Sequence, residues 1–193
     1  MKFAATARKE VGIRSVFNML GPLTNPAGAP NQVLGVFSID WVMPLAEVLK
    51  QLGSDHVLVV HAEDGLDEIS IGSPTRVAEL KDGGITVYTV VPEDFGLERA
   101  DLSAIAVADA GQSLAMISEV LDNRPGPARD IVMLNAGAAI YAAGVADSLA
   151  NGVERAGGVG RGAEHAGQVC GPQVSPARVG RCHADRAEGG GPG

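Results

Sequence analysis

The chain has 193 residues, of which 46% are hydrophobic and 20% are charged, and its formal net charge is −8. This length and apolar content suffice for one globular domain with a buried core. The acidic charge and the lack of any Lys/Arg cluster argue against a nucleic-acid-binding surface. No apolar run reaches the roughly eighteen residues of a membrane-spanning helix, and the charged first residues do not form a signal peptide.

The composition divides the chain at about residue 155. Every Phe, Trp, Tyr, Leu, Ile and Met lies at or before Leu149, whereas residues 156–193 hold 11 of the 26 glycines and both cysteines. This tail carries a net charge of +1, so the first 155 residues carry −9. We expect an α/β domain over residues 1–155 and a disordered Gly/Arg/Ala-rich tail over 156–193, because the tail cannot bury enough apolar surface to offset its ordering entropy. Both a frameshifted reading and a natural glycine-rich tail fit this composition.

The first half of the chain predicts a βαβ unit. Residues 1–11 are typical of a basic helix that continues into an apolar stripe and ends at Gly21. After a loop, residues 33–37 predict a strand and residues 41–52 an amphipathic helix. Residues 57–60 predict a second strand, apolar on both faces, as strands buried in a parallel sheet are.

The second half predicts a hairpin followed by helices. Residues 75–80 and 85–90 alternate around a Lys-Asp-Gly-Gly turn, which indicates an antiparallel hairpin. A turn at 92–96 precedes a short helix at 113–121 and a longer one at 128–145, whose alanine density implies close helix packing. The expected fold is therefore α/β, with a mostly parallel sheet flanked by helices and one antiparallel hairpin.

The most distinctive stretch is residues 12–26, with the sequence GIRSVFNMLGPLTNP. Gly21 lets the backbone approach a ligand closely, and Pro22 presents a rigid apolar wall to a flat ligand. Arg8 precedes this stretch, and the planar fork of an arginine can hold a carboxylate through two hydrogen bonds. From the residues alone, a solvated charge on a basic helix is the favoured interpretation of Arg8.

A second candidate site follows the strand at 57–60, in residues 64–70 with the sequence DGLDEIS. Asp67 and Glu68 are adjacent carboxylates at the position where open parallel sheets bind ligands. Mg²⁺ prefers oxygen ligands, and one or two carboxylates plus a substrate phosphate can hold it. Most such pairs are only solvated turns, so the pair alone is weak evidence of a metal site. Asp64 is assigned to the turn itself.

The remaining polar residues predict no catalytic or zinc site. His56 and His61 flank the strand at 57–60, which favours structural roles. The two cysteines and two histidines of the tail do not complete a zinc-binding pattern. Asn135, in the alanine-rich helix, is expected to be a buried polar residue bonded to the backbone.

The stretches 12–26 and 64–70 together resemble the C-terminal part of anthranilate phosphoribosyltransferase, an enzyme family of tryptophan biosynthesis, and the resemblance ends at about residue 155. It implies the catalytic-domain fold of nucleoside phosphorylases and phosphoribosyltransferases. It also implies a glycosyltransferase (pentosyltransferase) that joins anthranilate to the phosphoribosyl group of phosphoribosyl pyrophosphate. A cytoplasmic location is expected from the composition, because both cysteines lie in the tail and no disulfide framework supports the core.

The resemblance assigns roles to four residues. Arg8 matches the arginine that binds anthranilate, and Pro22 matches the proline that flanks its ring. Asp67 and Glu68 match the pair that holds Mg²⁺, which bridges to pyrophosphate. No residue of the chain matches a catalytic acid or base, because the reaction depends on positioning and charge neutralisation.

The resemblance also implies that the chain is truncated. The family's helical domain, its glycine-rich pyrophosphate loop and its Lys-His-Gly-Asn stretch would precede Met1. We therefore expect a fragment that is inactive in isolation, and the homodimer of the family is in doubt because it uses the helical domain. Two alternatives stay open, a pyrimidine nucleoside phosphorylase-like enzyme and a non-catalytic relative that binds nucleic acid. The charge of −9 argues against the second.

Overall fold

The structure is a computed structural model and describes residues 21, 23, 24 and 28–159. The helix predicted for residues 1–11 and the tail from residue 160 onward lie outside the described residues.

The described elements follow the predicted order. The strands are β1 (Asn31–Gly35), β2 (His56–Ala62), β3 (Thr75–Lys81) and β4 (Gly84–Val90), and the α-helices are α3 (Val42–Gln51), α4 (Ala110–Leu121), α5 (Pro127–Ala142) and α6 (Leu149–Val159). Three short 3-10 helices are η2 (Ile39–Trp41), η3 (Pro92–Phe95) and η4 (Leu102–Ile105). The strands and helices predicted between residues 33 and 145 are confirmed, with ends shifted by a few residues.

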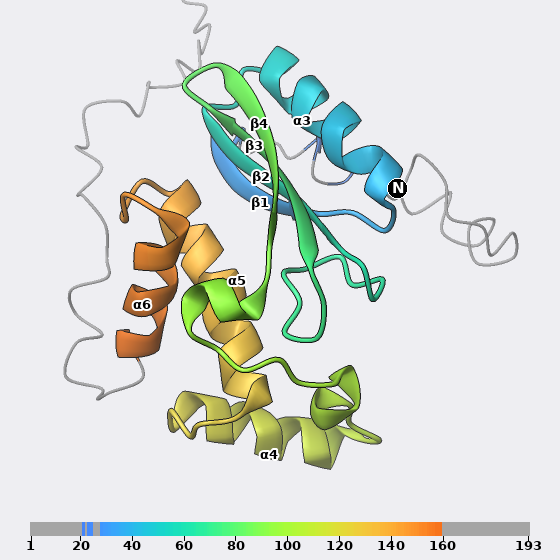
Figure 1. Cartoon of the computed structure of the whole chain (residues 1–193), viewed down its shortest axis with the longest axis vertical. Helices are drawn as coiled ribbons and strands as arrows, with labels where there is room; N and C mark the ends of the chain where they lie inside the picture. Colours follow the sequence, from blue (N-terminus) through green and yellow to red (C-terminus); the bar gives the residue numbers. More distant parts are fainter. Residues whose placement is uncertain (1–20, 22, 25–27, 160–193) are drawn as a thin grey trace, which may run out of the picture. The chain divides into compact units, whose positions relative to one another are not determined.

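The four strands form one mixed sheet in the order β1-β2-β3-β4 (Figure 1). β1 and β2 are parallel and α3 connects them, which confirms the βαβ unit. β2–β3 and β3–β4 are antiparallel pairs. At the turn of the β3–β4 hairpin, Asp82 and Gly83 have φ values of 51° and 73°, the left-handed geometry that an Asp-Gly pair supplies in two-residue hairpins.

Helices cover both faces of the sheet, with α3 on one face and α5 and α6 on the other (Figure 1). β2 contributes to both cores, because successive side chains of a strand point to opposite faces. Val57 and Val59 pack in the cluster with α3, whereas Leu58 and Val60 pack in the cluster with α5 and α6. This arrangement explains why the strand is apolar on both faces.

The helices α5 and α6 pack closely, as the small residues of α5 predicted. A methyl group added to Gly137 would lie 2.6 Å from the backbone nitrogen of Val153, and one added to Gly152 would overlap the carbonyl oxygen of Gly137. Only glycine at both positions allows the two backbones to approach this closely.

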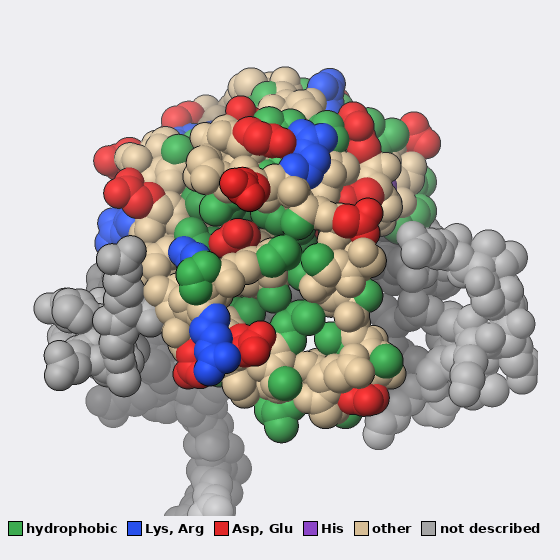
Figure 2. Space-filling view, turned by 60° about the horizontal axis from the view of Figure 1, so that its bottom comes forward, with side chains coloured by type: hydrophobic (Ala, Val, Ile, Leu, Met, Phe, Trp, Pro, Cys, Tyr) green, Lys and Arg blue, Asp and Glu red, His purple; other side chains and the backbone are tan. Residues whose placement is uncertain are grey.

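The helix α4 begins three residues before the predicted start, because Asp109 caps it by accepting a hydrogen bond from the N–H of Gln112 at 2.8 Å. None of its residues is fully buried, and Leu114, Ile117 and Leu121 are 66%, 53% and 75% exposed. Figure 2 brings the lower part of Figure 1, where α4 lies, to the front, and shows hydrophobic side chains interspersed with acidic ones there.

The helix α6 continues through the predicted boundary at residue 155 and ends at Val159. Val153 is buried in the core, and the guanidinium of Arg155 donates to the carbonyl of Val145 at 2.7 Å. The compact unit that contains the described residues extends to Arg161. No helix in the described part of the chain is long and apolar enough to cross a membrane.

Candidate functional site

The candidate site lies on the loop of residues 63–74, between β2 and β3. The parallel strands β1 and β2 both end at this edge of the sheet, where open sheets bind their ligands. Asp67 and Glu68 are both exposed on the loop. Leu66 before them is half-buried, and Ile69 after them is 2% exposed. The apolar neighbours therefore anchor the loop, while the two carboxylates face solvent.

Hydrogen bonds close this loop on itself. The N–H of Glu63 donates to the carbonyl of Pro74 at 2.9 Å, which joins the two ends of the loop. The Asp64 carboxylate accepts from the N–H of Leu66 at 3.2 Å and from the hydroxyl of Ser70. Asp64 is therefore a turn residue, as predicted, and its carboxylate is occupied within the loop.

The carboxylates of Asp67 and Glu68 have no hydrogen-bond or ion-pair partner among the described residues. No group of three His, Cys, Asp or Glu in this part of the chain could enclose a metal ion. Two free oxygen ligands on an exposed loop nevertheless fit Mg²⁺, which usually keeps several waters and completes its octahedron with substrate phosphates. The donor chemistry is consistent with a metal site that is completed by its substrate.

The structure brings Asp67 and Glu68 together on one loop, whereas Arg8 and Pro22 lie outside the described residues. Their predicted contacts with anthranilate stay predictions.

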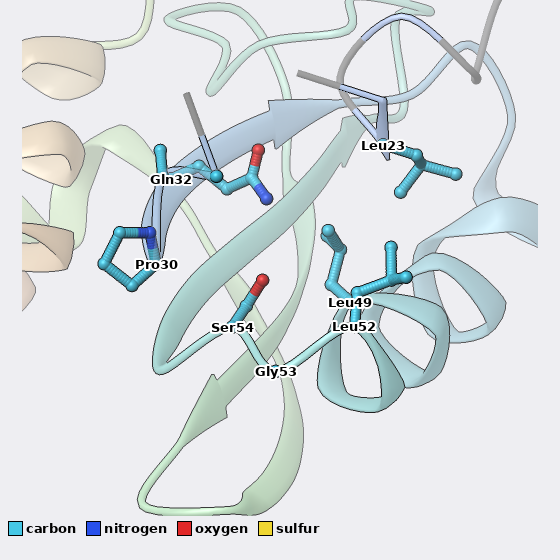
Figure 3. A pocket seen from close by; sticks show the side chains of 9 residues that line it. Leu23, Pro30, Gln32, Leu49, Leu52, Gly53 and Ser54 are labelled. Carbon is cyan, nitrogen blue, oxygen red and sulfur yellow. The ribbon is translucent and has the colours of Figure 1, made fainter. Parts of the chain in front are cut away.

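Leu23 lines a pocket of about 180 Å³ between α3 and the start of β1 (Figure 3). The other lining residues include Pro30, Leu49, Leu52 and Ser54. Pro30 and Ser54 precede β1 and β2, and the two leucines lie at the end of α3. The pocket therefore lies at the amino-terminal ends of these strands, at the opposite edge from the loop that carries Asp67. The pocket is also smaller than the roughly 300 Å³ at which typical ligand pockets begin, and we assign it no ligand.

A second, open pocket of about 560 Å³ lies near the carboxyl ends of β1 and β2, on the α3 side. Among the described residues that line it, Arg76 is the only positively charged one, and Asp40 and Glu63 are negatively charged. The guanidinium of Arg76 donates to the Thr89 hydroxyl at 3.4 Å. Neither Asp67 nor Glu68 lines either of these two pockets.

His56, His61 and Asn135 have partners within the fold, which agrees with the structural roles predicted for them. His56 Nε2 lies 2.9 Å from Oε1 of Glu79, and His61 Nδ1 lies 2.8 Å from the carbonyl oxygen of Val36. Asn135 is half-buried, and both ends of its side-chain amide bond to backbone groups.

The sequence pattern does not show that Gly35 lies against the site. Gly35 ends β1, and a methyl group on it would overlap the backbone carbonyl of Asp67. An isolated glycine inside an apolar strand can mark a close backbone approach. Residues 33–37 contain such an isolated glycine, but the sequence does not reveal which other segment of the chain packs against it.

Relatives of known structure share this fold. The anthranilate phosphoribosyltransferase of Thermus thermophilus superposes with a TM-score of 0.74 at 46% identity, over 82% of this chain and 47% of that chain. The Saccharomyces cerevisiae enzyme, solved in complex with PRPP and Mg, gives a TM-score of 0.71 at 27% identity, over 81% of this chain and 45% of that one.

Curated relatives are similar over the same part of the chain. The anthranilate phosphoribosyltransferase of Thioalkalivibrio sulfidiphilus is 70% identical over 156 residues, and that of Methylococcus capsulatus is 65% identical over 156 residues. These matches cover 81% of this chain and 46% of each relative, so the chain spans about half the length of the curated relatives it matches. Residues 1–161 match the family model described as "Glycosyl transferase family, a/b domain". The chain belongs to this glycosyl transferase family.

Proposed function

We propose that the chain is the α/β part of an anthranilate phosphoribosyltransferase, which transfers a phosphoribosyl group from phosphoribosyl pyrophosphate to anthranilate in tryptophan biosynthesis. The observation that carries the proposal is the Asp67–Glu68 pair, exposed on a closed loop at the ligand edge of the sheet. The names of relatives up to 70% identical support it. Yeast relatives solved with PRPP and Mg and with 4-fluoroanthranilate support the substrate classes.

In the proposed reaction, the anthranilate amine forms a bond to C1 of the ribose while the bond from C1 to pyrophosphate breaks. Asp67 and Glu68 would hold Mg²⁺, which would supply positive charge to neutralise the departing pyrophosphate. Arg8 would hold the anthranilate carboxylate through a two-pronged hydrogen bond, and Pro22 would pack against the ring. These groups align the amine with C1, so the protein acts by proximity and electrostatics.

The location and assembly of the protein are part of this proposal. A cytoplasmic location fits a biosynthetic enzyme with soluble, phosphorylated substrates. Homodimerisation is proposed only for an enzyme that also contains the family's helical domain, and the nucleic-acid-binding alternative is disfavoured by the charge of −9 on the first 155 residues.

A fusion protein tests the proposal. The amino-terminal half of the Thioalkalivibrio relative, which is 70% identical over the shared part, is joined in register to Met1, and the fluorescence of anthranilate is followed. We expect consumption that requires both phosphoribosyl pyrophosphate and Mg²⁺. Asp67→Ala should raise the Mg²⁺ concentration for half-maximal rate by about tenfold or more and leave the KM for anthranilate nearly unchanged.

The matched control is Glu47→Ala, which removes an exposed acid on α3 and should leave the Mg²⁺ dependence unchanged. A folded fusion that splits thymidine or uridine with phosphate, and does not consume anthranilate, would favour the pyrimidine nucleoside phosphorylase alternative. If the fusion consumes anthranilate but Asp67→Ala and Glu68→Ala keep the native Mg²⁺ dependence, only the metal assignment is wrong.

A further inference from the structure

Two residues that contact neither carboxylate hold the backbone beneath the Asp67–Glu68 pair. Asn135 lies in α5, and Gly35 ends β1. Each fixes the backbone at or beside one member of the pair, and the two come from different elements of the fold.

Asn135 binds the residue that follows Glu68. Its Oδ1 accepts from the N–H of Ile69 at 2.9 Å, and its Nδ2 donates to the carbonyl oxygen of the same residue at 2.9 Å. Nδ2 also donates to the carbonyl of Ile131, one turn earlier in α5, at 3.0 Å. The side chain therefore pairs with Ile69 as a neighbouring strand would. Because Ile69 is 2% exposed, its backbone groups would otherwise be buried without partners, which is costly.

Gly35 fixes the other side of the pair. A methyl group at this position would overlap both the carbonyl oxygen and the carbonyl carbon of Asp67. The Asp67 backbone therefore rests directly on the end of β1, and any side chain at Gly35 would push it away. The φ of Gly35 is not in the left-handed region, so close approach is the reason for glycine here.

Further bonds hold the segment beyond the pair. The N–H of Ser70 donates to the Thr75 hydroxyl at 3.0 Å, and the hydroxyl of Ser70 donates to Asp64. The loop thus has no regular strand pairing around Asp67 and Glu68, yet its backbone is fixed on both sides of them. When the backbone of a metal-binding residue is already fixed, metal binding does not incur the entropy cost of ordering a flexible loop.

We propose that Asn135 and Gly35 are positioning residues, which set the directions of the Asp67 and Glu68 carboxylates toward the cation without contacting it. The inference rests on the metal site of the proposed function and adds residues to it. Loosening either contact should weaken cation binding at the pair, even where the fold survives.

The experiment uses the full 193-residue chain, labelled with ¹⁵N, and Mn²⁺ alone as a paramagnetic probe. Broadening of the backbone amide signals of residues 66–69 reports binding at the pair, even when affinity is weak. Hydrogen exchange of the same amides reports the order of the loop. The test variants are Gly35→Ala and Asn135→Asp, the second of which keeps the side-chain shape but removes both Nδ2 hydrogen bonds.

Two controls separate positioning from stability. Gly84→Ala adds a methyl group at another strand glycine, where the nearest atom would be 3.6 Å away, and should change neither readout. Leu49→Ala removes a buried side chain from the α3 face of the sheet. It should lower the thermal stability of the chain without changing the Mn²⁺ concentration that broadens residues 66–69.

In both test variants, we expect the Mn²⁺ concentration for half-broadening to rise about tenfold, the range for residues that orient metal ligands, and amide exchange of the loop to accelerate. Native Mn²⁺ broadening in either folded variant would overturn the proposal for that residue. If the native chain shows no selective broadening at residues 66–69, the metal site of the proposed function fails. The positioning role, which rests on that metal site, would then fail with it.

Discussion

His56 and Glu79 form a largely buried pair on neighbouring strands, with Nε2 and Oε1 2.9 Å apart and only 10% and 12% of their side chains exposed. The same carboxylate accepts hydrogen bonds from the hydroxyls of Tyr141 at 2.6 Å and Tyr88 at 2.9 Å. Lys81 donates to the Tyr141 hydroxyl at 3.2 Å. The network links β2, β3, β4 and α5, so we expect it to stabilise the fold rather than take part in the reaction.

This network predicts a pH-dependent stability. Burial alone would raise the pKa of Glu79, but the hydrogen bonds from Tyr141, Tyr88 and His56 outweigh it and lower the pKa below 4.5. A lowered folded-state pKa gives stability that is complete above the unfolded-state pKa and is lost as the pH falls through the folded-state value. Glu79→Gln should lower the free energy of unfolding at pH 7 by about 1–3 kcal/mol and flatten its pH dependence below about pH 5. Urea unfolding at several pH values measures both.

The exposed Glu47 supplies the control for this prediction. Glu47→Gln should change the free energy of unfolding by less than about 0.5 kcal/mol and keep the native pH dependence. A Glu79→Gln protein with native stability at pH 7 would show that the network contributes nothing.

The contact between α5 and α6 predicts a second stability effect. Gly137→Ala places a methyl group against the backbone of Val153, and we expect it to destabilise the fold by about 1–3 kcal/mol. Gly158→Ala, in α6, meets no atom within 4 Å, and it should be neutral or stabilise the helix by up to about 1 kcal/mol. Chemical denaturation of both variants compares the two effects, and equal stabilities would contradict the close packing.

The sequence predicted the elements of the fold well because their signals are local. The run 57–60 is apolar at every position, and Asp82-Gly83 can adopt the left-handed turn that the hairpin needs. The start of α4 was placed three residues too late, because the cap at Asp109 is polar and does not extend the apolar pattern.

The candidate site was predicted only in part, because its geometry depends on contacts between distant residues. Asp67 and Glu68 follow a recognisable strand, so their place at the sheet edge could be inferred. The bonds from Asn135 to Ile69 join residues 66 positions apart, and the contact of Gly35 with Asp67 joins the end of β1 to the loop between β2 and β3. No periodicity of a single sequence reports such pairs.

The predicted division of the chain can be tested by truncation. The compact unit and the family match both end at Arg161, and no Phe, Trp, Tyr, Leu, Ile or Met follows Leu149. We propose that residues 162–193 contribute nothing to the stability of the α/β domain. A chain that ends at Arg161 should therefore unfold at the same urea concentration as the full chain. A clear shift of the midpoint would show that the tail packs on the domain.

The last prediction concerns Arg8 in the fusion enzyme described under the proposed function. If Arg8 holds the anthranilate carboxylate, Arg8→Ala should weaken binding by about 1.5–3 kcal/mol, the range for hydrogen bonds to charged groups. This corresponds to a rise of roughly tenfold to a hundredfold in the KM for anthranilate, where KM follows affinity. The KM for phosphoribosyl pyrophosphate should barely change, because its phosphates would be held away from Arg8, at the Mg²⁺ that Asp67 and Glu68 would bind.

Lys9→Ala is the matched control for this last substitution, because it removes the neighbouring positive charge and should leave both KM values nearly unchanged. Asp67→Ala should give the opposite pattern, a raised Mg²⁺ requirement with native anthranilate kinetics. Unchanged anthranilate kinetics in Arg8→Ala would mean that Arg8 is a solvated helix charge. A loss shared equally by Arg8→Ala and Lys9→Ala would point to general electrostatic attraction of the anion, because a two-pronged hydrogen bond requires one guanidinium at one position.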